Sequence, residues 1–212
     1  MITIKQFRRR SVRYLGAATV AAAATALAVS LSLTAASASP ATSASAASSP
    51  SFTFRLVPSP GIRACLPHIG GVVSIIPGSQ NDLMQVTIFG APRNAEFDLF
   101  VIQQPNKPFG VSWYQTDVNA NSHGVGSASV RGIFDRETFS VSPGGTTTFP
   151  PTHQYHLGLW FNDPKVPFNL GCEPGAPAPV VTPFNGQQHA GIQVLNTAEF
   201  PVNAGPLSRV HR

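Results

Sequence analysis

Charged residues are scarce in this chain, and they are unevenly placed. Lys, Arg, Asp and Glu make up 11% of the 212 residues, and no acidic residue precedes Asp82. Five of the 14 Lys and Arg residues lie within Lys5–Arg13, which leaves nine cations against nine acids in the rest of the chain. The formal net charge of +5 therefore belongs to the N-terminal segment. A neutral remainder lacks the basic surface that binds polyanions, so we expect no nucleic-acid partner.

Long apolar runs are absent apart from Leu15–Leu33, which follows the cationic segment and has no charged residue. Small residues come next, including Ala36-Ser37-Ala38 and Ala44-Ser45-Ala46. This order predicts a helical secretory signal peptide over residues 1–38, cleaved between Ala38 and Ala46 and first of all after Ala38. An uncleaved membrane anchor is the alternative, and Arg9-Arg10 leaves twin-arginine export open beside the general route. We expect an extracellular protein, free or associated with the cell wall, that is not attached to the membrane once the signal peptide is cleaved.

The rest of the chain divides into a linker, a domain and a tail. Residues 39–51 contain only Ser, Ala, Thr and Pro, a composition typical of a disordered linker. Residues 52–206 are long enough for one domain with its own core. Residues 207–212 are predicted to be a C-terminal tail.

Cysteine is rare, with only Cys65 and Cys172 in the chain. Both follow the predicted signal peptide, and export to an oxidising compartment makes a disulfide between them the expected state. This pairing leaves no thiol to act as a nucleophile or as a metal ligand.

Helical periodicity is missing beyond the leader, and all 20 prolines lie at or after Pro40. Frequent Pro and Gly residues break helices and favour short strands. Several apolar runs alternate with polar residues, as in Met84–Ile88, which predicts strands with one buried face. We predict an all-β fold, an antiparallel immunoglobulin-like β-sandwich of eight to nine strands, with a closed barrel as the alternative. The expected strands are Phe52–Val57, Val72–Ile76, Met84–Phe89, Phe97–Gln103, Val111–Gln115, Gly124–Val130, Thr138–Val141, Gln154–Phe161 and Gly191–Leu195.

Motifs of the common catalytic classes are lacking. No Gly-x-Ser-x-Gly occurs, and a phosphate-binding loop would need a helix that the pattern does not supply. Carboxyl groups such as Asp98 and Asp135 cannot be paired from one sequence. We therefore expect a non-catalytic protein without a cofactor.

Two motifs could hold a metal ion. Asp117-x-Asn119-x-Asn121 resembles the start of a calcium loop, but the acid expected at the twelfth position is Ala128, so a hairpin turn is favoured. His153, His156 and His189 could together bind zinc or copper. A metal-binding protein or metal-dependent enzyme built on these histidines is the alternative function, and ordinary surface or hydrogen-bonded histidines are the simpler interpretation.

Paired aromatic residues suggest a binding surface. Trp113-Tyr114 and Trp160-Phe161 each place two rings on opposite faces of a strand. An exposed ring could form a platform for a sugar or a peptide, although tryptophans that belong to the core are the simpler interpretation. We predict a glycan-, peptide- or cell-wall-binding module whose ligand-binding residues are Trp113, Tyr114, His156, Trp160 and His189.

Three segments resemble a family of small secreted proteins from high-GC Gram-positive bacteria. They are GAPRNAEFDLFVIQQPNKPFGVSWYQTD (Gly90–Asp117), HLGLWFN (His156–Asn162) and TPFNGQQHAGIQVLNTAEFP (Thr182–Pro201). The resemblance implies secretion and an all-β fold. It carries no assigned activity and no catalytic residue.

Overall fold

A computed structural model of the chain describes residues 50–134, 140–142, 145–147, 155–183 and 189–210. The predicted signal peptide, and the linker up to residue 49, lie outside these described residues. Within the described segments, no helix reaches the length and hydropathy needed to cross a membrane.

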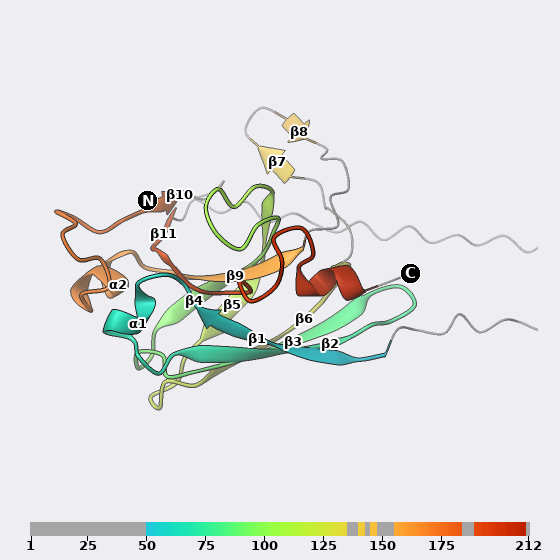
Figure 1. Ribbon diagram of the computed structural model, residues 1–212, viewed down its shortest axis with the longest axis horizontal. Helices are drawn as coiled ribbons and strands as arrows, with labels where there is room; N and C mark the ends of the chain where they lie inside the picture. The colour runs from blue at the N-terminus through green and yellow to red at the C-terminus, as the bar shows by residue number, and fades with distance from the viewer. Residues whose placement is uncertain (1–49, 135–139, 143–144, 148–154, 184–188, 211–212) are drawn as a thin grey trace, which may run out of the picture. The chain divides into compact units, whose positions relative to one another are not determined.

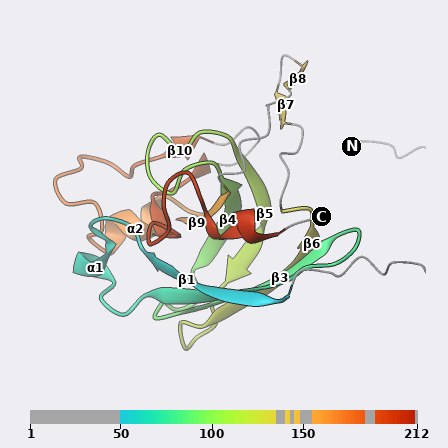
Figure 2. The same ribbon diagram turned by 45° about the vertical axis from the view of Figure 1, so that its right-hand side comes forward.

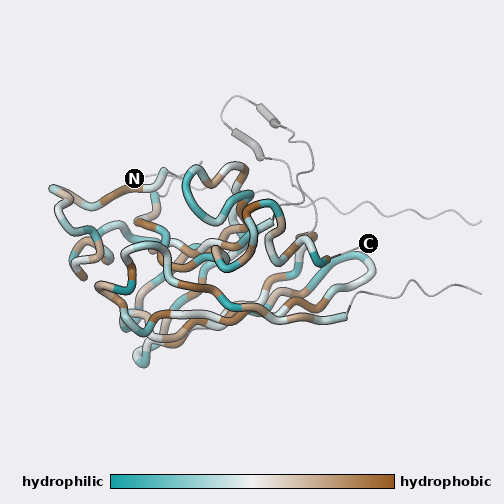
Figure 3. The backbone as a smooth tube through the Cα atoms, viewed as in Figure 1, coloured by the Kyte–Doolittle hydropathy of each residue, from teal (hydrophilic) through white to brown (hydrophobic). Residues whose placement is uncertain are grey.

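The strands follow the alternation in the sequence. In β3 (Asp82–Phe89), Met84, Val86 and Ile88 are buried, while Gln85 and Thr87 are exposed. Figure 3 shows hydrophobic and hydrophilic residues interspersed along the strands of the domain. Burying every second side chain against one core fixes the register of each strand, because a slip by one residue would expose the whole apolar set.

Eight strands form one antiparallel sheet in the order β5-β4-β9-β12-β1-β2-β3-β6 (Figure 1). β1 joins its two halves, because Phe52–Leu56 pair with β2 whereas Val57 and Pro58 pair with β12. The edge strands β5 and β6 are linked by a hairpin with a bridge between Ala120 and Gly126, so the sheet curls until its edges approach (Figure 2). Besides β3, the strands are β1 (Phe52–Pro58), β2 (Gly70–Ile76), β4 (Glu96–Ile102), β5 (Ser112–Asn119), β6 (Gly126–Gly132), β9 (His156–Phe161) and β12 (Gln193–Asn196).

The antiparallel all-β fold is confirmed, and eight of the nine expected strands overlap strands of the large sheet. The ninth, Thr138–Val141, overlaps β7 at Ser140 and Val141, and its first two residues lie outside the described residues. The immunoglobulin-like sandwich is not confirmed, since hydrogen bonds run through one continuous barrel-like sheet. Alternation could not separate the two, because a sandwich and a barrel both bury every second residue. Two further hairpins are small: β7 (Ser140–Ser142) with β8 (Gly145–Thr147), and β10 (Thr182–Pro183) with β11 (His189–Ala190).

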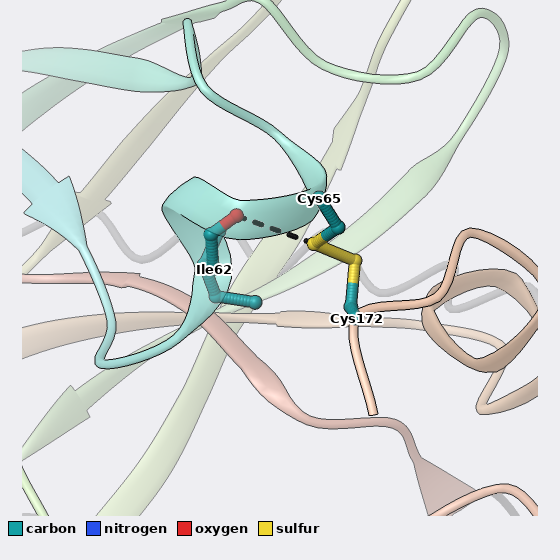
Figure 4. The surroundings of a disulfide bond; sticks show 3 residues. All are labelled: Ile62, Cys65 and Cys172. Carbon is teal, nitrogen blue, oxygen red and sulfur yellow. Dashed lines mark hydrogen bonds between the residues drawn. A yellow bond between two sulfur atoms is a disulfide. The ribbon is translucent and has the colours of Figure 1, made fainter. Parts of the chain in front are cut away.

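The predicted disulfide is confirmed. Cys65 ends the short helix α1 (Ile62–Cys65), and Cys172 lies just after α2 (Lys165–Asn169). Their Cα atoms are 5.1 Å apart across a sequence separation of 107 residues, and Cys65 Sγ lies 3.2 Å from the carbonyl oxygen of Ile62 (Figure 4). The bond therefore ties the α2 loop to the connection between β1 and β2.

The described part of the predicted C-terminal tail, residues 207–210, packs on the domain. The 3₁₀ helix η1 (Pro206–Arg209) packs on the domain, with Leu207 and Val210 buried in the main core. The Arg209 guanidinium lies 4.3 Å from the ring centroid of Phe52, a cation–π contact that fixes η1 to β1. The sequence predicted a tail here because so short a segment cannot show the periodic spacing of apolar residues that indicates a helix or a strand.

Candidate functional site

The half-sheet β5-β4-β9-β12 has apolar residues on both faces. Its inner face belongs to the main core, with Phe97 and Leu99 from β4 and Leu159 and Phe161 from β9. Its opposite face, called the outer face below, carries a second cluster built around Trp160. This cluster consists of Phe100, Ile102, Trp160 and Ala190, with Phe109 packed against it.

A β-bulge in β5 determines which of its side chains reach the outer face. Asp98 is paired with Asp117 and Phe100 with Tyr114, so β5 has one residue more than β4 between these pairs. Tyr114 and Asp117, three residues apart, therefore lie on the same face, where a regular strand would separate them. The Tyr114 hydroxyl donates a 2.7 Å hydrogen bond to Asp117 Oδ1.

A second bulge in β12 has the same effect at the other end of the outer face. Gln193 pairs with Trp160 and Asn196 with Gly158, again with one residue more than β9 between them. Asn196 Nδ2 donates to Gln193 Oε1 at 3.0 Å, and Ser59 Oγ donates to the same oxygen at 2.9 Å. Bulges that redirect side chains are over-represented beside functional sites.

Asp98 is the buried acid of the outer face, with 2% of its surface exposed. Asn162 Nδ2 donates a 2.9 Å hydrogen bond to Asp98 Oδ1, while Asp98 Oδ2 is buried without a hydrogen-bond partner. Burial raises the pKa of Asp98 to about 6; the hydrogen bond from Asn162 opposes this shift, and the neighbouring acids Asp117 and Glu96 add to it.

Tyr114 is the one exposed aromatic ring of this face among the described residues, with 51% of its surface accessible. Its ring packs edge-on against Phe100, at 5.8 Å between centroids. Partial burial of the side chain raises the Tyr114 pKa, and the bond to Asp117 and the charges of Asp117 and Asp98 add to the shift. Tyr114 therefore presents a neutral phenol next to two carboxyl groups.

Trp160 lies beneath this surface and is only 4% exposed. Its ring contacts Phe100 and Phe109 edge-on, at 5.4 and 5.0 Å between centroids, and Nε1 is buried without a partner. The ring fits here because Gly158 has no side chain: a Cβ there would lie 2.7 Å from Trp160 Cη2 and 2.8 Å from Gln193 Nε2.

The segment Gln103–Val111 folds back across the outer face and covers Trp160 with Phe109. Gln103 N donates to Val111 O at 2.7 Å, which closes the segment at its base. Gln193 Nε2 donates to the carbonyl of Pro105 at 3.1 Å and anchors the segment to β12. The exposed part of the face is therefore the end formed by Tyr114 and Asp117.

His156 is buried at the other end of β9 and both ring nitrogens are engaged. Nε2 lies 3.2 Å from the carbonyl of Val202, so Nε2 carries the proton and Nδ1 accepts from the Thr197 hydroxyl at 2.9 Å. Burial lowers the pKa of His156, while hydrogen bonds to backbone groups oppose the shift. His156 thus holds the segment after β12 as a neutral side chain.

The predicted ligand-binding set is not assembled as one surface. Trp113 lies on the inner face and packs edge-on against Tyr155 at 5.9 Å, whereas Tyr114 lies on the outer face. Trp160 and His156 are on the outer face but buried, and His189 is exposed in β11. The opposite placement of adjacent rings is confirmed. What the sequence missed is that Gln103–Val111 and the segment after β12 cover the face.

The histidine metal site has no support among the described residues. His153 lies outside them, and both nitrogens of His156 are used by Thr197 and Val202. No group of three or more His, Cys, Asp or Glu side chains in the described part of the chain could hold a metal ion. The turn predicted at Asn121 is present: its Oδ1 accepts hydrogen bonds from His123 N at 2.8 Å and Val125 N at 3.2 Å.

Asp98, Asp117 and Asn162 were not predicted as site residues. Asp98 lies two residues before the buried Phe100 in β4, so the two side chains share the outer face. An apolar, buried face is an unusual place for an acid. The spacing of Asp98 and Phe100 was the only signal in the sequence. The same spacing rule could not reveal Asp117, because the bulge lies between Asp117 and Tyr114.

Known proteins add no family to this description. No family model matches the chain, and no curated protein matches it. The resemblance to secreted proteins of high-GC Gram-positive bacteria remains a prediction.

Proposed function

We propose that the protein is a secreted, non-catalytic module that binds an extracellular glycan at the Tyr114 end of the outer face. One observation carries the proposal: an exposed aromatic ring stands beside Asp98, a buried carboxyl group with an unpartnered oxygen. Sugars present apolar C–H faces that stack on aromatic rings and hydroxyl groups that donate to carboxylates. The side chains of Tyr114, Asp117 and Asn162 supply both kinds of contact.

Secretion through the predicted signal peptide is part of this proposal. The disulfide between Cys65 and Cys172 supports it, because such bonds persist in oxidising compartments. Mass spectrometry of the protein recovered from culture medium tests it directly. A mature N-terminus between Ser39 and Ala47 is expected, and an intact leader would contradict cleavage.

A glycan array tests the binding function. We expect wild-type protein to bind a subset of glycans, Tyr114→Ala to lose that binding, and Tyr114→Phe to keep part of it through the ring. Phe89→Ala is the matched control, because Phe89 is another exposed ring, 45% accessible, in β3 of the other half-sheet. Absence of wild-type binding, or equal loss in Phe89→Ala, would overturn the proposal.

A further inference from the structure

Negative charge on the outer face is concentrated where β4 meets β5. Asp98 and Asp117 are directly paired across the two strands, and Glu96 lies two residues before Asp98. The charged groups that act on Asp98 are Asp117 and Glu96, both of them acids, with no contribution from a cation in the described part of the chain. This arrangement is unfavourable for the protein alone, because like charges placed opposite each other in a sheet destabilise it.

The second observation is the unpartnered oxygen of Asp98. Only 2% of the residue is exposed, and Asn162 donates to one of its oxygens. The buried Oδ2 has no donor while both acids are ionised, because the hydrogen bond between Asp98 and Asp117 forms only when one of the two is protonated. A buried acceptor without a partner costs free energy that a bound donor would recover. Between Asp98 and Asp117, the outer face therefore lacks both a hydrogen-bond donor and a positive charge.

We infer that the ligand carries a primary ammonium group, which binds between Asp98 and Asp117 against the ring of Tyr114. This inference rests on the proposed function and specifies its ligand as a glycan containing hexosamine units with free amino groups. An ammonium group supplies three donors and one positive charge, and its attraction to the face of an aromatic ring adds to both.

Other ligand chemistries fit these residues less well. A neutral hydroxyl group would satisfy Asp98 Oδ2 but would leave the repulsion between the two carboxylates. An anionic sugar would add to it. A metal ion needs more ligands than the described residues gather here, since no group of three His, Cys, Asp or Glu side chains exists among them.

The Tyr114 hydroxyl occupies the place on Asp117 that the ammonium group would take. It donates to Asp117 Oδ1 at 2.7 Å. The side chain is half exposed, so it can rotate outward at the cost of that one solvent-accessible bond. The ammonium group then replaces the hydroxyl at Asp117 and reaches Asp98 behind it.

Calorimetric titration with matched oligosaccharides tests the inference. A short oligosaccharide of glucosamine is compared, at about pH 7, with its N-acetylated counterpart, which keeps the sugar rings and lacks the charge. We expect wild-type protein to bind the glucosamine oligosaccharide about tenfold more tightly or better. Asp98→Asn and Asp117→Asn should each remove this preference, whereas Glu199→Gln, at an exposed acid outside the sheet, should keep it.

Several results would overturn the inference. Equal affinity for the two oligosaccharides, or a preference that survives both Asn variants while their far-UV circular dichroism shows a folded protein, would do so. Binding of Ca²⁺ that depends on Asp98 and Asp117, without any amine binding, would make this a cation site instead.

The same titrations separate this inference from the proposed function. Tyr114-dependent binding of neutral glycans alone would leave the glycan-binding function intact and refute the ammonium site. Nα-acetyl-lysine methylamide carries a primary ammonium group but no sugar. If the protein binds this compound through Asp98 and Asp117 and binds no glycan, the ammonium site is supported and the glycan function is refuted.

Discussion

Tyr114 and Asp117 are hydrogen-bonded on one face of β5 although three residues separate them in the chain. The bulge opposite the Leu99–Phe100 step of β4 makes this contact possible, and a bulge in β12 likewise brings Gln193 and Asn196 together. The two strands with these irregularities flank the regular strands β4 and β9. The polar residues of the outer face therefore depend on departures from strand alternation.

Replacing Asp98 with Asn should stabilise the protein at neutral and alkaline pH. The raised pKa of Asp98, about 6 against 3.8 for an ordinary Asp, means that its ionisation opposes folding. The contribution of Asp98 to the free energy of unfolding is greatest below pH 3.8 and falls as the pH rises to about 6. Urea unfolding at about pH 8 should show Asp98→Asn more stable by about 1–3 kcal/mol, with the gain vanishing at about pH 3.5. A loss of stability at pH 8 would contradict the claim that ionising the buried Asp98 opposes folding.

The buried imidazole of His156 should make stability fall under mildly acidic conditions. Its pKa in the folded protein is below the ordinary value of 6.5, so the unfolded chain takes up the proton first. The neutral His156 side chain makes its full contribution to the free energy of unfolding above pH 6.5. This contribution is lost as the pH falls from 6.5 toward the pKa of His156 in the folded protein. His156→Gln should flatten this part of the urea-unfolding profile, whereas His68→Gln, at an exposed histidine, should leave it unchanged.

Removing the Thr197 hydroxyl tests the hydrogen bonds of the same residue. Thr197 Oγ1 accepts from Leu157 N at 3.1 Å and lies 2.9 Å from His156 Nδ1. Thr197→Val keeps the shape and leaves both groups without this partner, so a loss of about 1–3 kcal/mol in the free energy of unfolding is expected. Thr87→Val, at an exposed position of β3, is the matched control and should change it little.

A side chain at Gly158 should displace Trp160. The Cβ atom of Gly158→Ala would lie 2.7 Å from Trp160 Cη2, closer than carbon atoms pack. The free energy of unfolding should drop by about 1–3 kcal/mol, and the near-ultraviolet circular dichroism of the aromatic residues should change. An unchanged spectrum with unchanged stability would show that the ring does not rest on Gly158.

The covalent bond between Cys65 and Cys172 should contribute strongly to stability. It closes a loop across a sequence separation of 107 residues, so the double variant Cys65→Ser, Cys172→Ser should unfold with about 2–5 kcal/mol less free energy. The same loss is expected when wild-type protein is unfolded in the presence of a reductant. A variant as stable as the oxidised protein would contradict a structural role.

The class of fold could be predicted from the sequence, because alternation such as Met84–Ile88 reflects local burial directly. The disulfide could be predicted because two cysteines allow one pairing. The order of the strands could not, since β1 pairs with both β2 and β12, a relationship between distant segments. The site was missed for the same reason: Asp98, Asp117 and Asn162 meet only through pairing and a bulge. The covering of Trp160, a predicted ligand-binding residue, could not be predicted because the covering segment, Gln103–Val111, has no pattern that shows where it folds.

The most direct test of the account is to locate the bound amine by nuclear magnetic resonance. The chain has two tryptophans, so two indole N–H signals report separately on the outer face through Trp160 and on the inner face through Trp113. On titration with the glucosamine oligosaccharide, we predict shifts in the Trp160 indole and in the amides of Asp98 and Asp117, with the Trp113 indole unchanged. Shifts confined to other strands, or none at all, would contradict the claim that the outer face is the binding site.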